Sequence, residues 1–135
     1  GGGWERIPTD PLRADLQAPI DPDRLARLIE PHRRELSARP LYISIDKDAL
    51  RASEAVVNWD SGFLDLDELD CILTGFIDAA DGKLAGLDST GDWSPVDVWG
   101  VLRRFLDVTE HPRLDVRPED AARINAGVNQ RILGI

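Results

Sequence analysis

The 135-residue chain carries 25 acidic and 16 basic side chains, which gives it a net charge of −9 at pH 7. This charge disfavours binding to nucleic acid or to an anionic membrane surface, and it favours metal cations and cationic ligands. With 42% hydrophobic and 30% charged residues, the composition is that of one globular domain or of part of one.

The chain has a single cysteine, Cys71, so no disulfide can form within it, and its place in an apolar helical pattern predicts a buried thiol. No apolar run approaches the ~18 residues that cross a bilayer, and no signal peptide is visible. Together these features predict a cytoplasmic protein. The chain begins at Gly1 and lacks methionine, so we expect a processed amino terminus or a part of a longer protein.

Proline and glycine divide the amino-terminal region from the rest. Residues 1–20 contain three prolines and three leading glycines, which predicts an irregular connection, and residues 21–135 are expected to form the folded unit. Asp21 and Pro22 predict the start of a helix, as N-cap and first helical residue. Pro31 predicts that this helix ends or kinks near Glu30.

The most informative stretch is the run Leu-Tyr-Ile-Ser-Ile-Asp-Lys-Asp over residues 41–48. Its β-branched and aromatic residues predict a buried strand that leads into Asp46 and Asp48. Side chains alternate along a strand, so the two carboxylates would share one face, about 6.8 Å apart at Cα, while Lys47 points away. That spacing suits one metal, or two metals about 3.5–4 Å apart. The alternative is that these acids form a turn or cap a helix.

A helix and a second strand follow. Asp65 with Glu68 three residues later predicts a capping box and a helix over 66–80. Its apolar residues recur at helical spacing and should face a sheet: Leu66, Leu69, Ile72, Leu73, Phe76 and Ile77. Gly82 predicts the end of this helix, and residues 83–88 read as a short strand.

Strand, helix and strand in this order predict a right-handed parallel βαβ unit, with strands 41–46 and 83–88 adjacent or nearly so. This topology places Asp88 at the same carboxyl edge as Asp46 and Asp48. A cluster of carboxylate oxygens suits a hard cation such as Mg²⁺ or Mn²⁺.

Two more helices are expected, one over about 95–108 and one that starts at Pro118. The second should bury the face formed by Ala121, Ile124, Val128 and Ile132. Residues 57–62 read as an ordered loop at the carboxyl edge of the sheet, where α/β proteins bind substrates. Trp59 in this loop either contacts a substrate or packs the loop onto the core.

Other catalytic signals are missing from the sequence. His32 and His111 have no acid at ligand spacing and are expected at the surface. No nucleophile motif, cysteine cluster or phosphate-binding glycine loop is present.

Three segments in this order resemble the carboxyl-terminal half of an arginase-like ureohydrolase, the family of arginase, agmatinase and formimidoylglutamase. They are Ser-Ile-Asp-Lys-Asp at 44–48, Asn-Trp-Asp-Ser-Gly at 58–62 and Gly-Leu-Asp-Ser-Thr-Gly-Asp-Trp-Ser-Pro at 86–95. The resemblance runs from about residue 40 to the end. It implies a three-layer α/β/α fold with a parallel sheet, only part of which this chain supplies. It also implies a binuclear manganese centre that generates a hydroxide to attack a guanidinium or amidine carbon.

The resemblance assigns roles residue by residue. Asp46 and Asp48 match the family's metal ligands, and Asp88 matches the acid at the end of the next strand. The remaining matches imply contacts to a guanidino-type substrate or to the groups around the metal, from Asn58, Trp59, Asp60 and Asp92.

Departures from the family pattern limit what carries over. Ala-Leu-Arg at 49–51 replaces the family's usual Asp-Pro, so the substrate is not transferred. The earlier motifs Gly-Gly-Asp-His and Asp-Ala-His-x-Asp, which supply the other ligands, are missing. We therefore expect weak metal retention and no hydrolysis of arginine or agmatine by this chain alone. The alternative is a non-catalytic α/β module that binds a partner. Unpaired strand edges further predict that this chain alone self-associates, for example as a homo-oligomer, or is only marginally stable.

Overall fold

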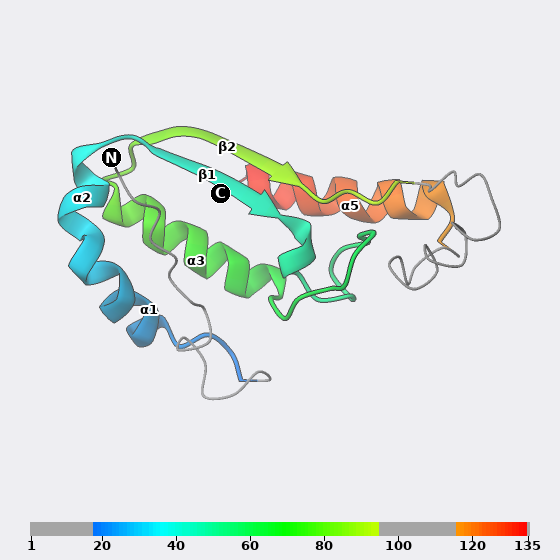
Figure 1. Cartoon of the computed structure of the whole chain (residues 1–135), viewed down its shortest axis with the longest axis horizontal. Helices are drawn as coiled ribbons and strands as arrows, with labels where there is room; N and C mark the ends of the chain where they lie inside the picture. Colours follow the sequence, from blue (N-terminus) through cyan, green and yellow to red (C-terminus); the bar gives the residue numbers. More distant parts are fainter. Residues whose placement is uncertain (1–17, 95–115, 135) are drawn as a thin grey trace, which may run out of the picture.

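A computed structural model describes residues 18–94 and 116–134 of the chain (Figure 1). The predicted connection over 1–20 lies almost wholly outside these residues, as do the predicted helix over 95–108 and His111. The described elements, in chain order, are α1 (Pro22–Ile29), the 3-10 turn η2 (Glu30–His32), α2 (Arg33–Ala38), β1 (Leu41–Asp46), the 3-10 turn η3 (Lys47–Ala49), α3 (Leu66–Ala79), β2 (Leu84–Thr90) and α5 (Pro118–Leu133). None of the described helices combines the length and apolar character needed to cross a membrane.

The two strands form a parallel sheet, as predicted, with α3 as the connection between them. The register pairs Ser44 with Asp88 and Asp46 with Thr90. Strand β2 therefore continues two residues beyond the predicted end. The prediction that Asp88 lies at the carboxyl edge beside Asp46 is wrong, because Asp88 sits within the strand instead.

One face of the sheet carries the core. Its strand residues Ile43, Ile45 and Leu87 pack with helix residues from both α3 and α5, namely Leu69, Leu73, Val128 and Ile132. Both helices thus cover the same face (Figure 1). The opposite face presents Tyr42, which is 61% exposed, and Ser44. The described residues form an α/β unit with a two-stranded parallel sheet.

The amino-terminal helices pack on α3. Asp21 caps α1 as predicted, since its Oδ1 accepts hydrogen bonds from the backbone N–H groups of Asp23 at 2.9 Å and Arg24 at 3.3 Å. After Ile29 the chain passes through the 3-10 turn that contains Pro31, so the predicted helix end is confirmed. Leu25 and Ile29 form a second apolar cluster with residues of α3.

Helix α3 begins with the predicted capping box. The Glu68 N–H donates to Asp65 Oδ1 at 2.8 Å, and the Asp65 N–H donates to Glu68 Oε2 at 2.9 Å. Its apolar residues serve two partners: Leu69 and Leu73 belong to the sheet-facing core, whereas Ile72, Phe76 and the partly buried Cys71 pack with the cluster around α1. The helix is apolar over a wide arc because it lies between the sheet and α1.

Helix α5 buries most of the predicted face, but Asn125 takes the place of Ile124 in it. Ala121, Val128 and Ile132 are buried as expected, but Ile124 is 40% exposed and Asn125 is only 4% exposed. Burial of Asn125 costs little free energy because its side-chain amide forms two hydrogen bonds with the backbone of Val56. Its Oδ1 accepts from the Val56 N–H at 3.0 Å, and its Nδ2 donates to the Val56 carbonyl at 2.7 Å. This pair of bonds fixes the segment after η3 to α5.

Replacement of Asn125 by alanine is expected to cost about 1–3 kcal/mol of unfolding free energy, because it leaves the buried N–H and carbonyl of Val56 without partners. The neighbouring Ile124→Ala variant is the control and should change stability by about 0.5 kcal/mol or less, since Ile124 lies at the surface. Urea unfolding followed by circular dichroism measures both. Equal losses would show that the assigned helix face is wrong.

Candidate functional site

The two candidate metal ligands lie where β1 ends. Asp46 is the last residue of the strand, and Asp48 lies in the 3-10 turn η3 that follows. The prediction that both occupy one strand face is therefore wrong. The reason is local: Asp46 Oδ1 accepts a hydrogen bond from the Asp48 N–H at 3.1 Å and so caps the turn. The alternative role of a turn-forming acid thus applies to Asp46.

Both carboxylates nevertheless lie beside the loop that follows β2. Gly91 in this loop has φ +81°, and a Cβ built on it would lie 2.6 Å from Asp46 Oδ1 and 3.4 Å from Asp48 Oδ1. Only a residue without a side chain permits this approach. Gly91 thus allows the loop to pack directly against Asp46 Oδ1, with Asp48 Oδ1 close by.

The Asp48 carboxylate is poorly satisfied in this position. Its Oδ1 is buried and has no hydrogen-bond partner among the residues that the structure describes. Burial, together with the negative charge of Asp46, raises the pKa of Asp48. The pKa of Asp48 is thus higher in the folded chain than in the unfolded chain, so its contribution to stability is fully present below the unfolded pKa. This contribution is lost as the pH rises through the raised pKa of the folded state. A cation at this position would relieve both causes of the shift.

No further ligand completes this pair within residues 18–94 and 116–134, where no group of three or more His, Cys, Asp or Glu side chains is placed to hold a metal ion. Asp88 accepts hydrogen bonds from the Tyr42 hydroxyl and, at 2.7 Å, from the Ser44 hydroxyl on the exposed face of the sheet. Asp92 is directed to Lys47. The described site is therefore a pair of carboxylates.

Lys47 lies between the two acids in the sequence but on the opposite side of the chain. Its side chain is completely buried, and its Nζ lies 2.6 Å from Oδ1 of Asp92, whose side chain is 55% exposed. The predicted direction of Lys47, away from Asp46, agrees with this burial. Its ion pair with Asp92 was not predicted, although the alternation that places Ile43 and Ile45 inward also points residue 47 inward.

Asn58 forms hydrogen bonds with Ser94, two residues after Asp92 in the same loop. Its Nδ2 donates to the Ser94 carbonyl at 3.1 Å and to the Ser94 hydroxyl at 3.3 Å, while its Oδ1 accepts from the Ser94 N–H at 2.8 Å. Trp59 and Asp60, which follow it, are exposed. The structure thus places Asn58 against the loop that carries Asp92 and leaves Trp59 and Asp60 at the surface. Substrate contact by any of the four stays a prediction.

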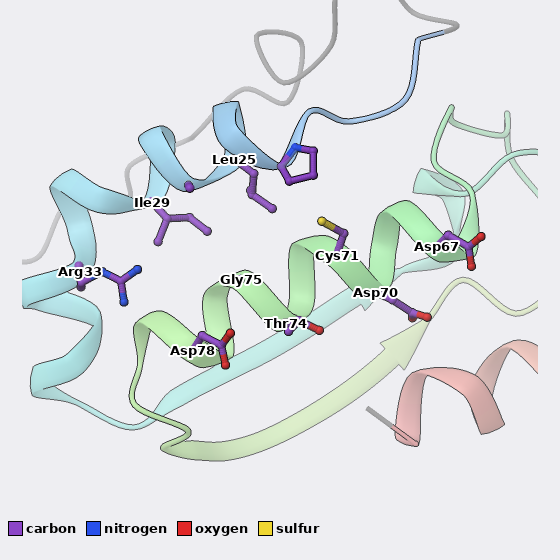
Figure 2. Close-up of a pocket in the computed structure, with 11 residues that line it drawn as sticks. Leu25, Ile29, Arg33, Asp67, Asp70, Cys71, Thr74, Gly75 and Asp78 are labelled. Atoms are coloured by element: carbon purple, nitrogen blue, oxygen red, sulfur yellow. The ribbon is translucent and has the colours of Figure 1, made fainter.

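Three hollows within the described residues lie near these elements. One has a volume of about 340 Å³ and lies between the loop after β2 and α5, with Asp92, Trp93, Asn125 and Asn129 among its lining residues. Another has a volume of about 570 Å³ and lies between α1 and α3 (Figure 2). The second is lined by neither Asp46 nor Asp48, and Asp67 and Asp70 at its edge pair with Arg131 of α5. The third has a volume of about 390 Å³ and lies along β1 and α3, with Asp46 and Ala49 among its lining residues. The first therefore adjoins the candidate site through Asp92, and the third adjoins it through Asp46.

Comparison of this chain with protein-family models, with curated proteins and with solved structures found no match. The functional argument therefore rests on the positions and chemistry of the residues described above.

The contact at Gly91 can be tested against a second glycine of similar backbone conformation. Gly82 has φ +71° but open space around it, so Gly82→Ala should cost only the backbone strain, about 1–2 kcal/mol. Gly91→Ala carries the same strain and also drives a methyl group into Asp46 Oδ1, so its loss of unfolding free energy should be larger by about 1 kcal/mol or more. Chemical denaturation of both variants gives the difference, and equal losses would place Asp46 away from Gly91.

Tyr42 is the only tyrosine, so tyrosinate absorbance reports on it alone. The hydrogen bond to Asp88 and the negative charge of Asp88 raise the pKa of Tyr42 above its ordinary value of 10.0. Hydrogen bonds from Tyr42 and Ser44 lower the pKa of Asp88. The pair therefore stabilises the fold between these limits: the contribution is lost as pH rises through the Tyr42 pKa or falls through that of Asp88.

Asp88→Asn should accordingly lower the pKa of Tyr42 toward about 10, because the charge and the ionised acceptor are both removed. Spectrophotometric titration of the phenol measures this change. Asp60→Asn is the matched control and should leave the titration where it is. An unchanged midpoint in Asp88→Asn would contradict the pairing across the two strands.

Proposed function

We propose that this chain supplies Asp46 and Asp48 as carboxylate ligands to the manganese centre of an arginase-like ureohydrolase, which hydrolyses a C–N bond of a guanidino or amidino substrate. The observation that carries the proposal is the buried, unpartnered Oδ1 of Asp48 beside Asp46, where Gly91 packs against both acids. Two carboxylates held together without a cation between them are electrostatically unfavourable. A bound divalent cation supplies the missing partner.

The chemistry of the donor atoms fits such a metal. Carboxylate oxygens are preferred by hard cations such as Mn²⁺ and Mg²⁺. Two ligands do not complete a centre, so the remaining ligands must come from residues outside the described ranges or from another polypeptide. Manganese bound there would activate water for attack on the substrate carbon.

The three-layer α/β/α architecture is part of the proposal. It is supported by the parallel pair β1 and β2, by helices that cover one sheet face, and by the polar, exposed opposite face around Tyr42 and Ser44. A third layer on that face would bury the Tyr42 and Asp88 pair, which is already hydrogen-bonded and so is suited to burial.

Charge and placement support the substrate class that the resemblance implies. A net charge of −9 attracts a guanidinium cation. Asp92, which directly follows Gly91, supplies a carboxylate in the loop after β2. Asp92 lines the hollow against α5, together with Trp93, whose ring is able to stack on a planar cation. Asn58, Trp59 and Asp60 remain candidate contacts through the neighbouring loop.

A non-catalytic interaction module is the second candidate. It is favoured by Trp59 and Phe63, two large apolar side chains that are both more than half exposed in one loop. Such a module would not depend on a cation at Asp46 and Asp48. Metal dependence therefore separates the two functions.

The test is manganese binding by the purified chain. Mn²⁺ should raise the melting temperature of the wild type, and Asp46→Asn and Asp48→Asn should lose this response because each removes a charged ligand. Asp78→Asn, an exposed acid at the end of α3, should retain it. Without metal, Asp48→Asn should be at least as stable as the wild type, since the amide replaces a carboxylate whose charge is disfavoured by burial. An unchanged manganese stoichiometry in both variants would refute the ligand assignment.

The pH dependence of metal binding gives an independent check. Protons and Mn²⁺ compete for Asp48, so affinity should fall as the pH is lowered through its raised pKa, above the range of an ordinary aspartate near 4. Titration calorimetry at a series of pH values measures the midpoint. Metal binding that persists unchanged at acidic pH would exclude Asp48 as a ligand.

A further inference from the structure

The loop over residues 90–94 is held at two points by side chains that come from other parts of the chain. One point is the ion pair between Lys47 and Asp92, and the other is the set of three hydrogen bonds between Asn58 and Ser94. Between β2 and Asp92, Gly91 lies against the Oδ1 atoms of Asp46 and Asp48. The position of this loop therefore depends on residues that do not belong to it.

The Lys47 contact is the stronger constraint. A lysine side chain with no exposed surface needs a partner for its ammonium group, and Asp92 Oδ1 at 2.6 Å is that partner. The reverse does not hold, because the Asp92 side chain is about half exposed and is hydrated on its own. The charge of Lys47 thus requires the loop to stay in place, whereas the charge of Asp92 does not require Lys47, because it is exposed to solvent.

The Asn58 contact ties the loop to α5. The segment that carries Asn58 is itself fixed two residues earlier, where Asn125 of α5 binds both backbone groups of Val56. Helix α5 also forms a wall of the hollow that Asp92 and Trp93 line. A shift of the loop would therefore change the distance across this hollow, between Asp92 on one side and Asn129 on the other.

The arrangement leaves Asp92 with one engaged and one available oxygen. Lys47 donates to Oδ1, and no group within the described residues donates to Oδ2. On the opposite side of the hollow, Oδ1 of Asn129 is buried without a hydrogen-bond partner in the same set of residues. Two acceptors on one hollow match a ligand that is rich in N–H donors and positively charged, as a guanidinium group is.

We propose that Lys47 and Asn58 are positioning residues, which fix the loop over 90–94 so that Asp92 Oδ2 accepts an N–H of a guanidinium-type ligand in the hollow against α5. The proposal rests on the proposed function for its ligand class. The placement of the loop by Lys47 and Asn58 does not depend on that function and is measured separately.

The loop itself contains a reporter, Trp93. In protein labelled with fluorotryptophan, the four tryptophans give separate fluorine NMR signals, and replacement of each by phenylalanine assigns them. Lys47→Met removes the ammonium but retains an apolar stem in the core, so the Trp93 signal should shift or broaden while the circular dichroism spectrum is unchanged. Lys83→Met is the matched control, because Lys83 is a half-exposed lysine paired with Asp81 near the start of β2, and it should leave the signal in place.

Ligand binding is measured on the same proteins with agmatine as the probe, in the presence of Mn²⁺. Lys47→Met and Asn58→Ala should each lower the affinity for agmatine tenfold or more. Both should keep manganese affinity within about threefold of the wild type, since the Asp46 and Asp48 carboxylates remain. Lys83→Met should change neither. A merely structural role for Lys47 would reduce both affinities together with the melting temperature.

Each outcome decides one point. An unchanged Trp93 signal and unchanged agmatine affinity in folded Lys47→Met and Asn58→Ala would overturn the proposal and leave the metal site intact. If Lys47→Met fails to fold, Asn58→Ala alone decides, because Asn58 is partly exposed and its loss leaves no buried charge. If the wild type binds neither Mn²⁺ nor agmatine, the proposed function fails, and the ligand part of the proposal with it, while the Trp93 signal still tests the positioning of the loop.

Discussion

The parallel pairing of β1 and β2 is the constraint on which the candidate site depends. In a parallel pair both strands end at the same edge, so the segments that follow them, η3 after Asp46 and the loop after Thr90, must start side by side. Helix α3 makes this possible because it returns the chain along the sheet and buries Leu69 and Leu73 against Ile45. The capping box at its start and the positive-φ residues at its end determine where the crossover begins and stops.

Local rules predicted the elements of this unit well. The N-cap at Asp21, the capping box at Asp65, the strand at 41–46 and the parallel topology each follow from a few adjacent residues, and all are present. Tertiary contacts account for two of the errors. Asn125 occupies a buried position on α5 because Val56 supplies both of its hydrogen bonds, a partner 69 residues away that no helical pattern reveals. Strand β2 extends to Thr90 because β1 offers pairing partners as far as Asp46.

The acids were predicted as a group, but the structure separates them by the partner that each one has. Asp88 is held by two hydroxyl groups from β1, and Asp92 is held by an ammonium group, so neither is an unsatisfied charge. Among the four predicted acids, Asp46, Asp48, Asp88 and Asp92, only Asp48 has a buried oxygen without a hydrogen-bond partner among the described residues. Composition and spacing show how many carboxylates a segment holds. They do not show which of these are already neutralised, and this distinction marks a candidate metal ligand.

At the end of β1, neighbouring residues place an acid at the surface and a lysine in the core. The alternation of the strand sends Asp46 to the exposed side and Lys47 to the core side, so a positive charge and a candidate cation ligand are adjacent in sequence but are separated by the backbone. Burial of the lysine then demands a carboxylate, and the loop after β2 supplies it through Asp92. The same loop passes Gly91 beside Asp46 and Asp48. The buried charge of Lys47 therefore fixes the loop on one side of η3, and the same loop contacts the Asp46 and Asp48 pair on the other side. This double contact explains why the loop needs both a glycine at 91 and an acid at 92.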